Sequence, residues 1–183
     1  TQSVNTIVFE NNNLVGHNTD VIGFTRAITD LNFNIKGSKI FILGAGGVVP
    51  SIIFALNKMG VSQITISNRT KEKAENLKIK FNNLKIIDWG TIQDFDMIIN
   101  ATSLGLNKEE INLDFTRIGN GKLFYDVIYN PSETNFLKEG RKLGNKVENG
   151  KLMFLYQAFE AFKLWHGIEP QINENIMRLL END

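Results

Sequence analysis

The sequence contains no cysteine. Disulfide bonds and thiolate metal ligands are therefore excluded, and any redox chemistry must come from a bound cofactor. It also lacks an apolar run of the roughly 18 residues that cross a membrane, and its N-terminus lacks a signal-peptide pattern. Basic and acidic residues number 20 each, so bulk charge favours neither nucleic acid nor a membrane as a partner. We expect a cytoplasmic protein without a metal site.

What the sequence does contain is typical of a soluble globular domain. Hydrophobic residues make up 42% and charged residues 22% of its 183 residues, a length that suits one domain with a small attachment. The first residue is Thr1 rather than Met. We therefore expect the chain to be part of a longer protein.

Short apolar runs and helical periodicities alternate along most of the chain. Strands are predicted over residues 39–43, 63–67, 85–87, 97–100 and 123–128, and helices over residues 50–59, 71–81, 152–165 and 172–180. Residues 5–9 and 14–17 resemble a hairpin, and a helix follows with Asp20 as its predicted N-cap. This alternation predicts an α/β fold, a Rossmann-like doubly wound parallel sheet with helices on both faces.

A glycine-rich segment, Gly44-Ala45-Gly46-Gly47, follows one predicted strand and opens a helix. In that context the glycines allow a tight turn and a close backbone approach to a pyrophosphate, and the helix N-terminus supplies free N–H groups. The segment predicts a dinucleotide site, and a turn that binds nothing is the alternative. Val49 stands where the usual pattern has Gly or Ala, so helix and strand must approach each other differently.

The second predicted strand ends without the acidic residue that accepts hydrogen bonds from the ribose of NAD. Instead, Asn68-Arg69-Thr70 and Lys73 follow it. A guanidinium, a hydroxyl and an ammonium suit the 2′-phosphate of NADP, which we therefore predict as the cofactor. The alternative is that Arg69 and Lys73 are solvated charges at the start of a surface helix.

A series of motifs, taken in order, resembles the shikimate dehydrogenase family over about the C-terminal two thirds of that family's length. They are Val4-Asn5-Thr6, Asn18-Thr19-Asp20 with Gly23-Phe24, the glycine segment, Asn68-Arg69-Thr70, Ile99-Asn100-Ala101-Thr102-Ser103 with Gly105, Tyr125-Asp126-Val127-Ile128-Tyr129 with Pro131 and Thr134, and Asn149-Gly150 with Met153 and Gln157. Such enzymes reduce 3-dehydroshikimate to shikimate with NADPH, in aromatic amino acid biosynthesis.

The resemblance assigns roles to individual residues. Substrate binding is implied for Asn5, Asp20, Tyr129 and Gln157, with Asp20 also one member of the catalytic pair. Cofactor binding is implied for Gly44, Ala45, Gly46, Gly47, Asn68, Arg69, Thr70, Lys73, Thr102, Ser103, Val127, Gly150 and Met153. Taken alone, these positions also allow structural roles, such as a turn for Asn5, a helix cap for Asp20, core packing for Met153, a solvated helix face for Gln157 and a half-buried aromatic for Tyr129.

Some features depart from the family pattern. The family's catalytic Lys lies upstream of the Val-Asn-Thr motif and outside this chain, Val21 replaces a common Gly, and residues 48–50 replace smaller or basic residues. We expect residues 1–32 to be a remnant of a substrate domain with a linker helix, residues 33–150 to be the NADP-binding domain, and residues 151–183 to complete the cleft.

The expected partner is a small molecule, shikimate or 3-dehydroshikimate, and a homodimer stays open. We expect the chain by itself to bind NADP without useful turnover. The alternatives are a quinate/shikimate dehydrogenase of mixed cofactor use and a non-catalytic nucleotide-binding module.

Overall fold

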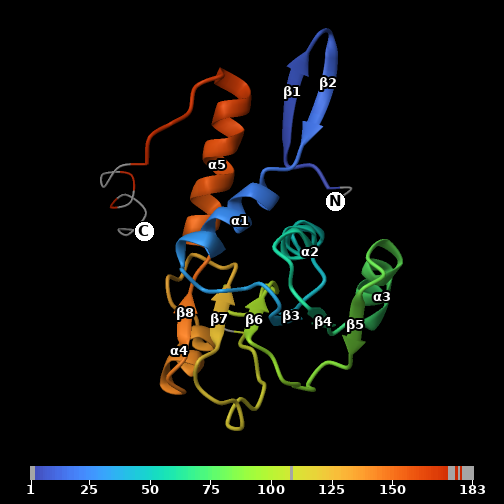
Figure 1. Ribbon diagram of the computed structural model, residues 1–183, viewed down its shortest axis with the longest axis vertical. Helices are drawn as coiled ribbons and strands as arrows, with labels where there is room; N and C mark the ends of the chain where they lie inside the picture. Colours follow the sequence, from blue (N-terminus) through green and yellow to red (C-terminus); the bar gives the residue numbers. More distant parts are fainter. Residues whose placement is uncertain (1–2, 108, 173–175, 177, 179–183) are drawn as a thin grey trace.

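A hairpin followed by a larger sheet with flanking helices makes up the computed structural model (Figure 1), which describes residues 3–107, 109–172, 176 and 178. The predicted helix over residues 172–180 lies mostly outside the described residues. The elements are β1 (Thr6–Glu10), β2 (Asn13–His17), α1 (Asp20–Asp30), β3 (Lys39–Leu43), α2 (Val49–Lys58), β4 (Gln63–Ser67), α3 (Lys71–Lys80), β5 (Leu84–Ile87), β6 (Met97–Asn100), β7 (Leu123–Asp126), α4 (Asn135–Lys142), β8 (Lys146–Glu148) and α5 (Lys151–His166). Within these residues no helix has the length and apolar character needed to span a bilayer.

The six-stranded sheet has the order β5-β4-β3-β6-β7-β8, and every neighbouring pair is parallel. The chain leaves the central strand β3 toward β4 and β5, then returns to build β6 on the other side of β3. The predicted doubly wound α/β fold is therefore confirmed. In such sheets ligands bind outside the carboxyl ends of the strands at the point where the strand order reverses, which here lies between β3 and β6.

Residues of β3 show how the sheet separates two cores. Ile40 and Ile42 belong to a core formed with α1, α2, α3 and α5, whereas Phe41 and Leu43 belong to a second core formed with α4 and neighbouring loops. All four side chains are at most 1% exposed. Such a strand, buried on both faces, reads in the sequence as one continuous apolar run.

Helices α1 and α5 cross closely at Gly23. A Cβ atom at this position would lie 2.7 Å from the carbonyl oxygen of Met153 and 2.9 Å from Cβ of Gln157. Neither distance is sterically allowed, so only glycine permits this approach. The crossing brings the first turn of α1 to the N-terminal half of α5.

The hairpin of β1 and β2 projects away from the sheet, next to the C-terminal half of α5 (Figure 1). Its apolar side chains Ile7, Phe9 and Leu14 are 57%, 68% and 75% exposed. The indole nitrogen of Trp165 in α5 donates a hydrogen bond to the carbonyl of Ile7, 2.9 Å away. The hairpin is thus attached to the body of the protein but adds little to its core.

The prediction that Asp20 caps α1 is wrong. The N-cap residue is Thr19, and Asp20 is the first residue of the helix. Asn18 performs the capping, because its side-chain oxygen accepts a hydrogen bond from the backbone nitrogen of Val21 at 3.2 Å. Asp20 is instead engaged by Asn5, whose amide donates to its carboxylate at 2.9 Å.

The sequence analysis also missed two elements, α4 and β8. Helix α4 begins after Thr134, whose hydroxyl accepts a hydrogen bond from the backbone nitrogen of Leu137, an N-cap signal present in the sequence. Strand β8 is only three residues long. The predicted strand over residues 123–128 ends at Asp126, because the backbone nitrogen of Ile128 turns to the Asp126 side chain at 3.0 Å.

Candidate active site

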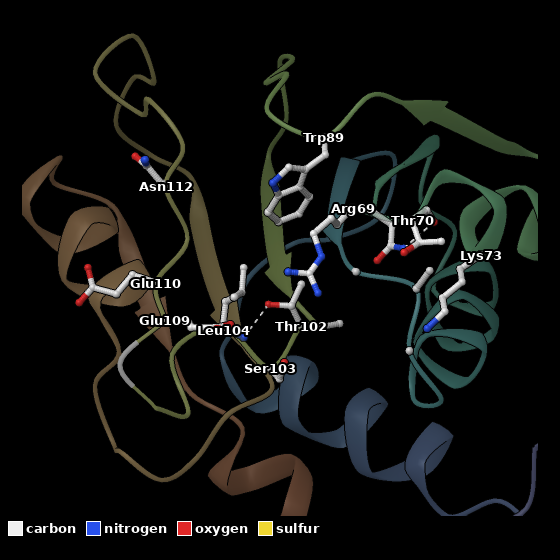
Figure 2. A pocket seen from close by; sticks show the side chains of 15 residues that line it. Arg69, Thr70, Lys73, Trp89, Thr102, Ser103, Leu104, Glu109, Glu110 and Asn112 are labelled. Carbon is white, nitrogen blue, oxygen red and sulfur yellow. Dashed lines mark hydrogen bonds between the residues drawn. The ribbon is translucent and has the colours of Figure 1, made fainter.

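A cavity of about 700 Å³ opens at the carboxyl edge of the sheet, beside the point where the strand order reverses (Figure 2). Its walls come from the glycine segment, the residues at the start of α3, Trp89 after β5, the loop after β6 and residues 109–112. The lining residues are Gly44, Ala45, Gly46, Asn68, Arg69, Thr70, Lys73, Trp89, Ala101, Thr102, Ser103, Leu104, Glu109, Glu110 and Asn112.

Gly44 joins the ends of three strands. Its backbone nitrogen donates to the carbonyl of Ser67 at 2.8 Å, and its φ is 109°, a value that side chains rarely allow. A Cβ atom at Gly44 would lie 2.6 Å from the carbonyl oxygen of Ala101. The backbone can therefore pass between β4 and β6 only where this residue is glycine.

The glycine segment leads directly into α2, and no side chain caps this helix. A helix N-terminus carries free N–H groups and a partial positive charge, so it favours a phosphate. Val49, where the sequence departs from the usual pattern, is fully buried and packs in the first core. The geometry therefore fits a pyrophosphate at the glycine segment.

Two cations enter the cavity from the start of α3. The Asn68 amide donates to the carbonyl of Thr70 at 2.7 Å, and this bond holds the turn that carries Arg69. Figure 2 shows Arg69 reaching toward Thr102. Neither the Arg69 guanidinium nor the Lys73 ammonium forms a hydrogen bond or ion pair with another residue in the described part of the chain. Both charges are available to an anionic ligand.

The loop after β6 is shaped by Asn100. Its side-chain oxygen accepts hydrogen bonds from the nitrogen and the hydroxyl of Thr102, at 3.0 and 2.7 Å. Its amide donates to Asp126 at 3.0 Å, and Thr134 donates to the other oxygen of Asp126 at 2.6 Å. Burial raises the pKa of Asp126, although these hydrogen bonds oppose the rise. The network fixes Thr102 and Ser103 at the cavity wall.

A second polar cluster joins the hairpin to α1 and α5. The Asn5 amide donates to Thr19 at 3.0 Å as well as to Asp20 at 2.9 Å, and the Thr19 hydroxyl lies 3.4 Å from the side-chain oxygen of Gln157. Burial raises the pKa of Asp20, and the Asn5 hydrogen bond partly offsets it. A carboxyl with a raised pKa is suited to transfer of a proton. The structure thus brings three of the predicted substrate residues, Asn5, Asp20 and Gln157, into one cluster.

The fourth predicted substrate residue, Tyr129, stacks on Phe154 of α5 with ring centres 4.7 Å apart. It is 43% exposed. Gly150 lies close by, where its nitrogen donates to the carbonyl of Ile128 at 3.0 Å. Met153 is only 6% exposed and belongs to the core.

Most, but not all, of the predicted cofactor residues line the cavity. Those that do are Gly44, Ala45, Gly46, Asn68, Arg69, Thr70, Lys73, Thr102 and Ser103, whereas Gly47, Val127, Gly150 and Met153 do not. Sequence reasoning missed Trp89, Ala101, Leu104, Glu109, Glu110 and Asn112. For Trp89 a signal was present, because it follows the carboxyl end of a strand. Among the described residues no cluster of three or more His, Asp or Glu side chains could hold a metal ion.

Comparison with known proteins identifies the family. The family described as Shikimate / quinate 5-dehydrogenase matches residues 26–126, and Shikimate 5'-dehydrogenase C-terminal domain matches residues 152–178. A relative named shikimate dehydrogenase (NADP(+)), from Pelagibacter ubique, is 52% identical over 98% of this chain and 68% of its own length. The chain belongs to the shikimate dehydrogenase family.

Solved shikimate dehydrogenases share the fold. The Aquifex aeolicus enzyme superposes with a TM-score of 0.86 at 37% identity, over 98% of this chain and 66% of that chain. The Thermus thermophilus enzyme, solved in complex with NADP(H) and shikimate, gives 0.80 at 31% identity over 92% and 64% of the two chains. The chain thus spans about two thirds of the length of its shikimate dehydrogenase relatives.

Proposed function

We propose that this chain binds NADP(H) and forms the cofactor-binding portion of an enzyme that reduces 3-dehydroshikimate to shikimate. One observation carries the proposal, namely that the cavity combines a helix without a side-chain cap at a glycine turn with Arg69 and Lys73, neither of which has an ion-pair partner among the residues that the structure describes. The names of the relatives agree with it, since they are shikimate dehydrogenases that use NADP.

Different residues would hold the parts of the cofactor. Gly44, Ala45, Gly46 and Gly47 would hold the pyrophosphate through backbone N–H groups. Asn68, Arg69, Thr70 and Lys73 would hold the 2′-phosphate, and Thr102 and Ser103 would line the path between the two halves. Val127, Gly150 and Met153 would lie near the nicotinamide, which supplies the hydride when NADPH is bound.

The cluster of Asn5, Asp20 and Gln157 would form one wall of the substrate site. Asn5 and Gln157 offer amide groups to substrate hydroxyls, and Tyr129 adds a phenol nearby. A ketone that accepts a hydride develops negative charge on its oxygen, and a group that donates a proton to that oxygen lowers the barrier. Asp20, with its raised pKa, would take part in this proton transfer together with the family's upstream Lys.

We also propose the division into residues 1–32, 33–150 and 151–183 as substrate-domain remnant, NADP-binding domain and C-terminal completion of the cleft. Under this division the 183 residues, expressed by themselves, would keep cofactor binding because the whole phosphate site lies within them. They would lose turnover because the Lys and the opposite wall of the substrate site are supplied from elsewhere.

The homodimer is a further proposal, and light scattering of the purified chain checks it.

Calorimetric titration of the 183-residue chain with NADP+ and NAD+ tests the cofactor assignment. We expect tighter binding of NADP+, and equal affinity for the two would contradict it. A parallel assay of NADPH formation from shikimate, against a full-length family member, tests the loss of turnover. General acid–base assistance supplies about 10² to 10⁴ in rate, so activity within about tenfold of the full-length enzyme would refute the division.

The substrate assignment is tested at Gln157. In the full-length enzyme, the change corresponding to Gln157→Ala should raise the Michaelis constant for shikimate and leave that for NADP+ nearly unchanged. The matched control is Lys163→Ala, at an exposed position of the same helix, and it should alter neither Michaelis constant. Assays with quinate in place of shikimate, and with NAD+ in place of NADP+, separate the quinate/shikimate alternative. A non-catalytic module would show cofactor binding but no turnover even in the full-length protein.

A further inference from the structure

We infer that Trp89 forms a wall of the adenine subsite and stacks against the base of the bound nucleotide. The inference rests on the proposed function, because it assumes that the cavity holds an adenine dinucleotide. It adds a binding residue that none of the motifs contains.

Trp89 occupies a position between core and cavity. It follows β5 at the carboxyl edge of the sheet and lines the cavity together with Arg69 and Thr102. It is half-buried and packs against the second core, which contains Phe41 and Leu43. One part of the indole is therefore supported by the protein while another faces the cavity.

The backbone around Trp89 is held in place by its neighbour Asp88. The carbonyl of Asp88 accepts hydrogen bonds from the Ser67 hydroxyl and the Thr91 nitrogen, each 3.2 Å long. Its carboxylate pairs with the Lys71 ammonium at 2.7 Å. Because Lys71 begins α3, this ion pair joins the Trp89 turn to the segment that carries Arg69.

The cofactor's own geometry places adenine near this turn. The 2′-phosphate and the base are attached to the same ribose, so a phosphate bound at Arg69 and Lys73 leaves the base beside them. Figure 2 shows the Trp89 side chain adjacent to Arg69. A base stacked on an aromatic ring gains affinity, and a ring already supported by the core loses little side-chain entropy on binding.

The chain offers a direct optical test, because it contains only two tryptophans, Trp89 and Trp165. Trp165 lies on α5 and contacts the hairpin. In the Trp165→Phe variant all tryptophan fluorescence comes from Trp89. Titration with adenosine 2′,5′-bisphosphate should change this fluorescence, and nicotinamide mononucleotide, which lacks adenine, should not. In the Trp89→Phe variant, where Trp165 is the reporter, adenosine 2′,5′-bisphosphate should leave the signal unchanged.

Affinity measured by calorimetry completes the test. Trp89→Leu keeps an apolar group on the core but removes the ring, so adenosine 2′,5′-bisphosphate should bind between about fivefold and 100-fold more weakly. Trp89→Phe should restore most of the affinity, and thermal melting of both variants checks that they fold.

The outcomes separate the two proposals. Binding that is equally tight in wild type and Trp89→Leu, with no change in Trp89 fluorescence, overturns this inference alone. Absence of binding of both adenosine 2′,5′-bisphosphate and NADP+ to the folded wild type overturns it together with the proposed function.

Discussion

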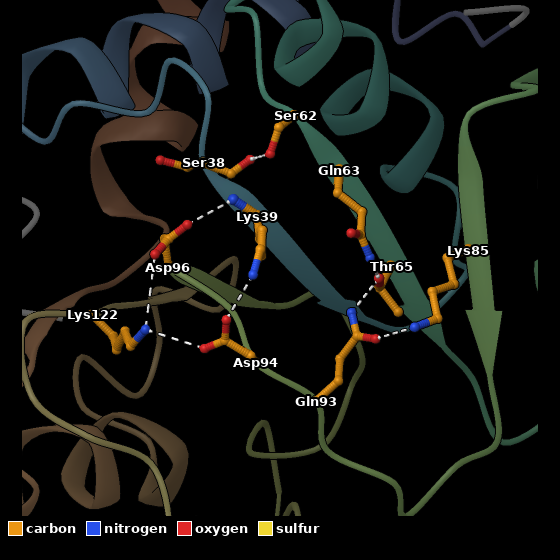
Figure 3. A network of polar contacts seen from close by, with 10 residues as sticks. All are labelled: Ser38, Lys39, Ser62, Gln63, Thr65, Lys85, Gln93, Asp94, Asp96 and Lys122. Carbon is orange, nitrogen blue, oxygen red and sulfur yellow. Dashed lines mark hydrogen bonds and ion pairs between the residues drawn. The ribbon is translucent and has the colours of Figure 1, made fainter.

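The two edges of the sheet both carry basic and polar side chains, but they use them differently. At the amino edge, Lys39 pairs with Asp94 at 2.9 Å, and Lys122 lies 3.5 Å from Asp94 and 3.8 Å from Asp96 (Figure 3). At the carboxyl edge, Arg69 and Lys73 have no such partner among the described residues.

The difference follows from what each edge has to do. Residues at the amino edge connect loops to strands, as when the Asp96 carboxylate accepts a hydrogen bond from the Lys39 backbone at 2.8 Å and Gln93 bonds to Thr65. Their charges neutralise one another. Unpaired charges at the carboxyl edge are a feature of a binding site, because a phosphate can supply the missing partner.

The largest effect is expected from Gly44→Ala. Its positive φ and the short distance to the Ala101 carbonyl should together destabilise the fold by about 2 to 5 kcal/mol and abolish measurable NADP+ binding. Urea denaturation and calorimetry measure the two effects. Gly119→Ala is the matched control, since nothing lies within 4 Å of the added Cβ there. A Gly44→Ala variant as stable as this control would show that the strand ends do not need the turn as described.

The next effect is expected from Arg69→Ala, which removes one of the cations that line the cavity. A hydrogen bond to a charged group contributes about 1.5 to 3 kcal/mol, so NADP+ affinity should fall about tenfold to 100-fold while NAD+ affinity stays the same. Calorimetric titration with both cofactors measures this selectivity. Lys80→Ala, at the other end of α3, controls for the loss of a surface charge. Equal losses for the two cofactors would remove Arg69 from the 2′-phosphate site.

The sequence predicts the sheet and the carboxyl edge better than the rest because their signals are local. A buried strand such as β3 is a continuous apolar run, and the glycines that follow it mark a turn. Glu109 and Glu110 reach the cavity only through the path of their loop, which no periodicity encodes. The mistaken cap at Asp20 has a similar origin, because a partner distant in sequence, Asn5, determines what its carboxylate does.

A third prediction concerns Asp126, a fully buried carboxyl at the carboxyl edge. Burial raises its pKa above the ordinary 3.8, so the folded state binds its proton more tightly than the unfolded state does. The stability that this proton contributes is fully present below the unfolded pKa and is lost as the pH rises through the folded pKa. The loss is at most about 1.4 kcal/mol per pH unit.

Urea denaturation at several pH values, on wild type and Asp126→Asn, measures this dependence, which the variant should lack. The exposed Asp114 is the control, because the pH dependence of its contribution to stability has the opposite sign. Hydrogen bonds from Thr116 lower its pKa, so its contribution is present above the unfolded pKa and is lost as the pH falls. The stability of wild type and that of Asp126→Asn could instead show the same pH dependence as the pH rises above the unfolded pKa of Asp126. In that case Asp126 is ionised as readily in the folded as in the unfolded state, and the prediction fails.

The smallest effect is expected at the amino edge, from Asp94→Asn. The Asp94 side chain is 69% exposed and its partner Lys39 49% exposed. Although the pKa of Asp94 is lowered by its hydrogen bond to Lys39, exposed ion pairs contribute little because water and salt screen them. The melting temperature should fall by less than about 2 °C, and the difference should vanish at high salt. NADP+ affinity should not change, because Asp94 lies at the opposite edge from the cavity. A selective loss of NADP+ affinity in this variant would mean that the two edges are coupled, and the contrast between them would fail.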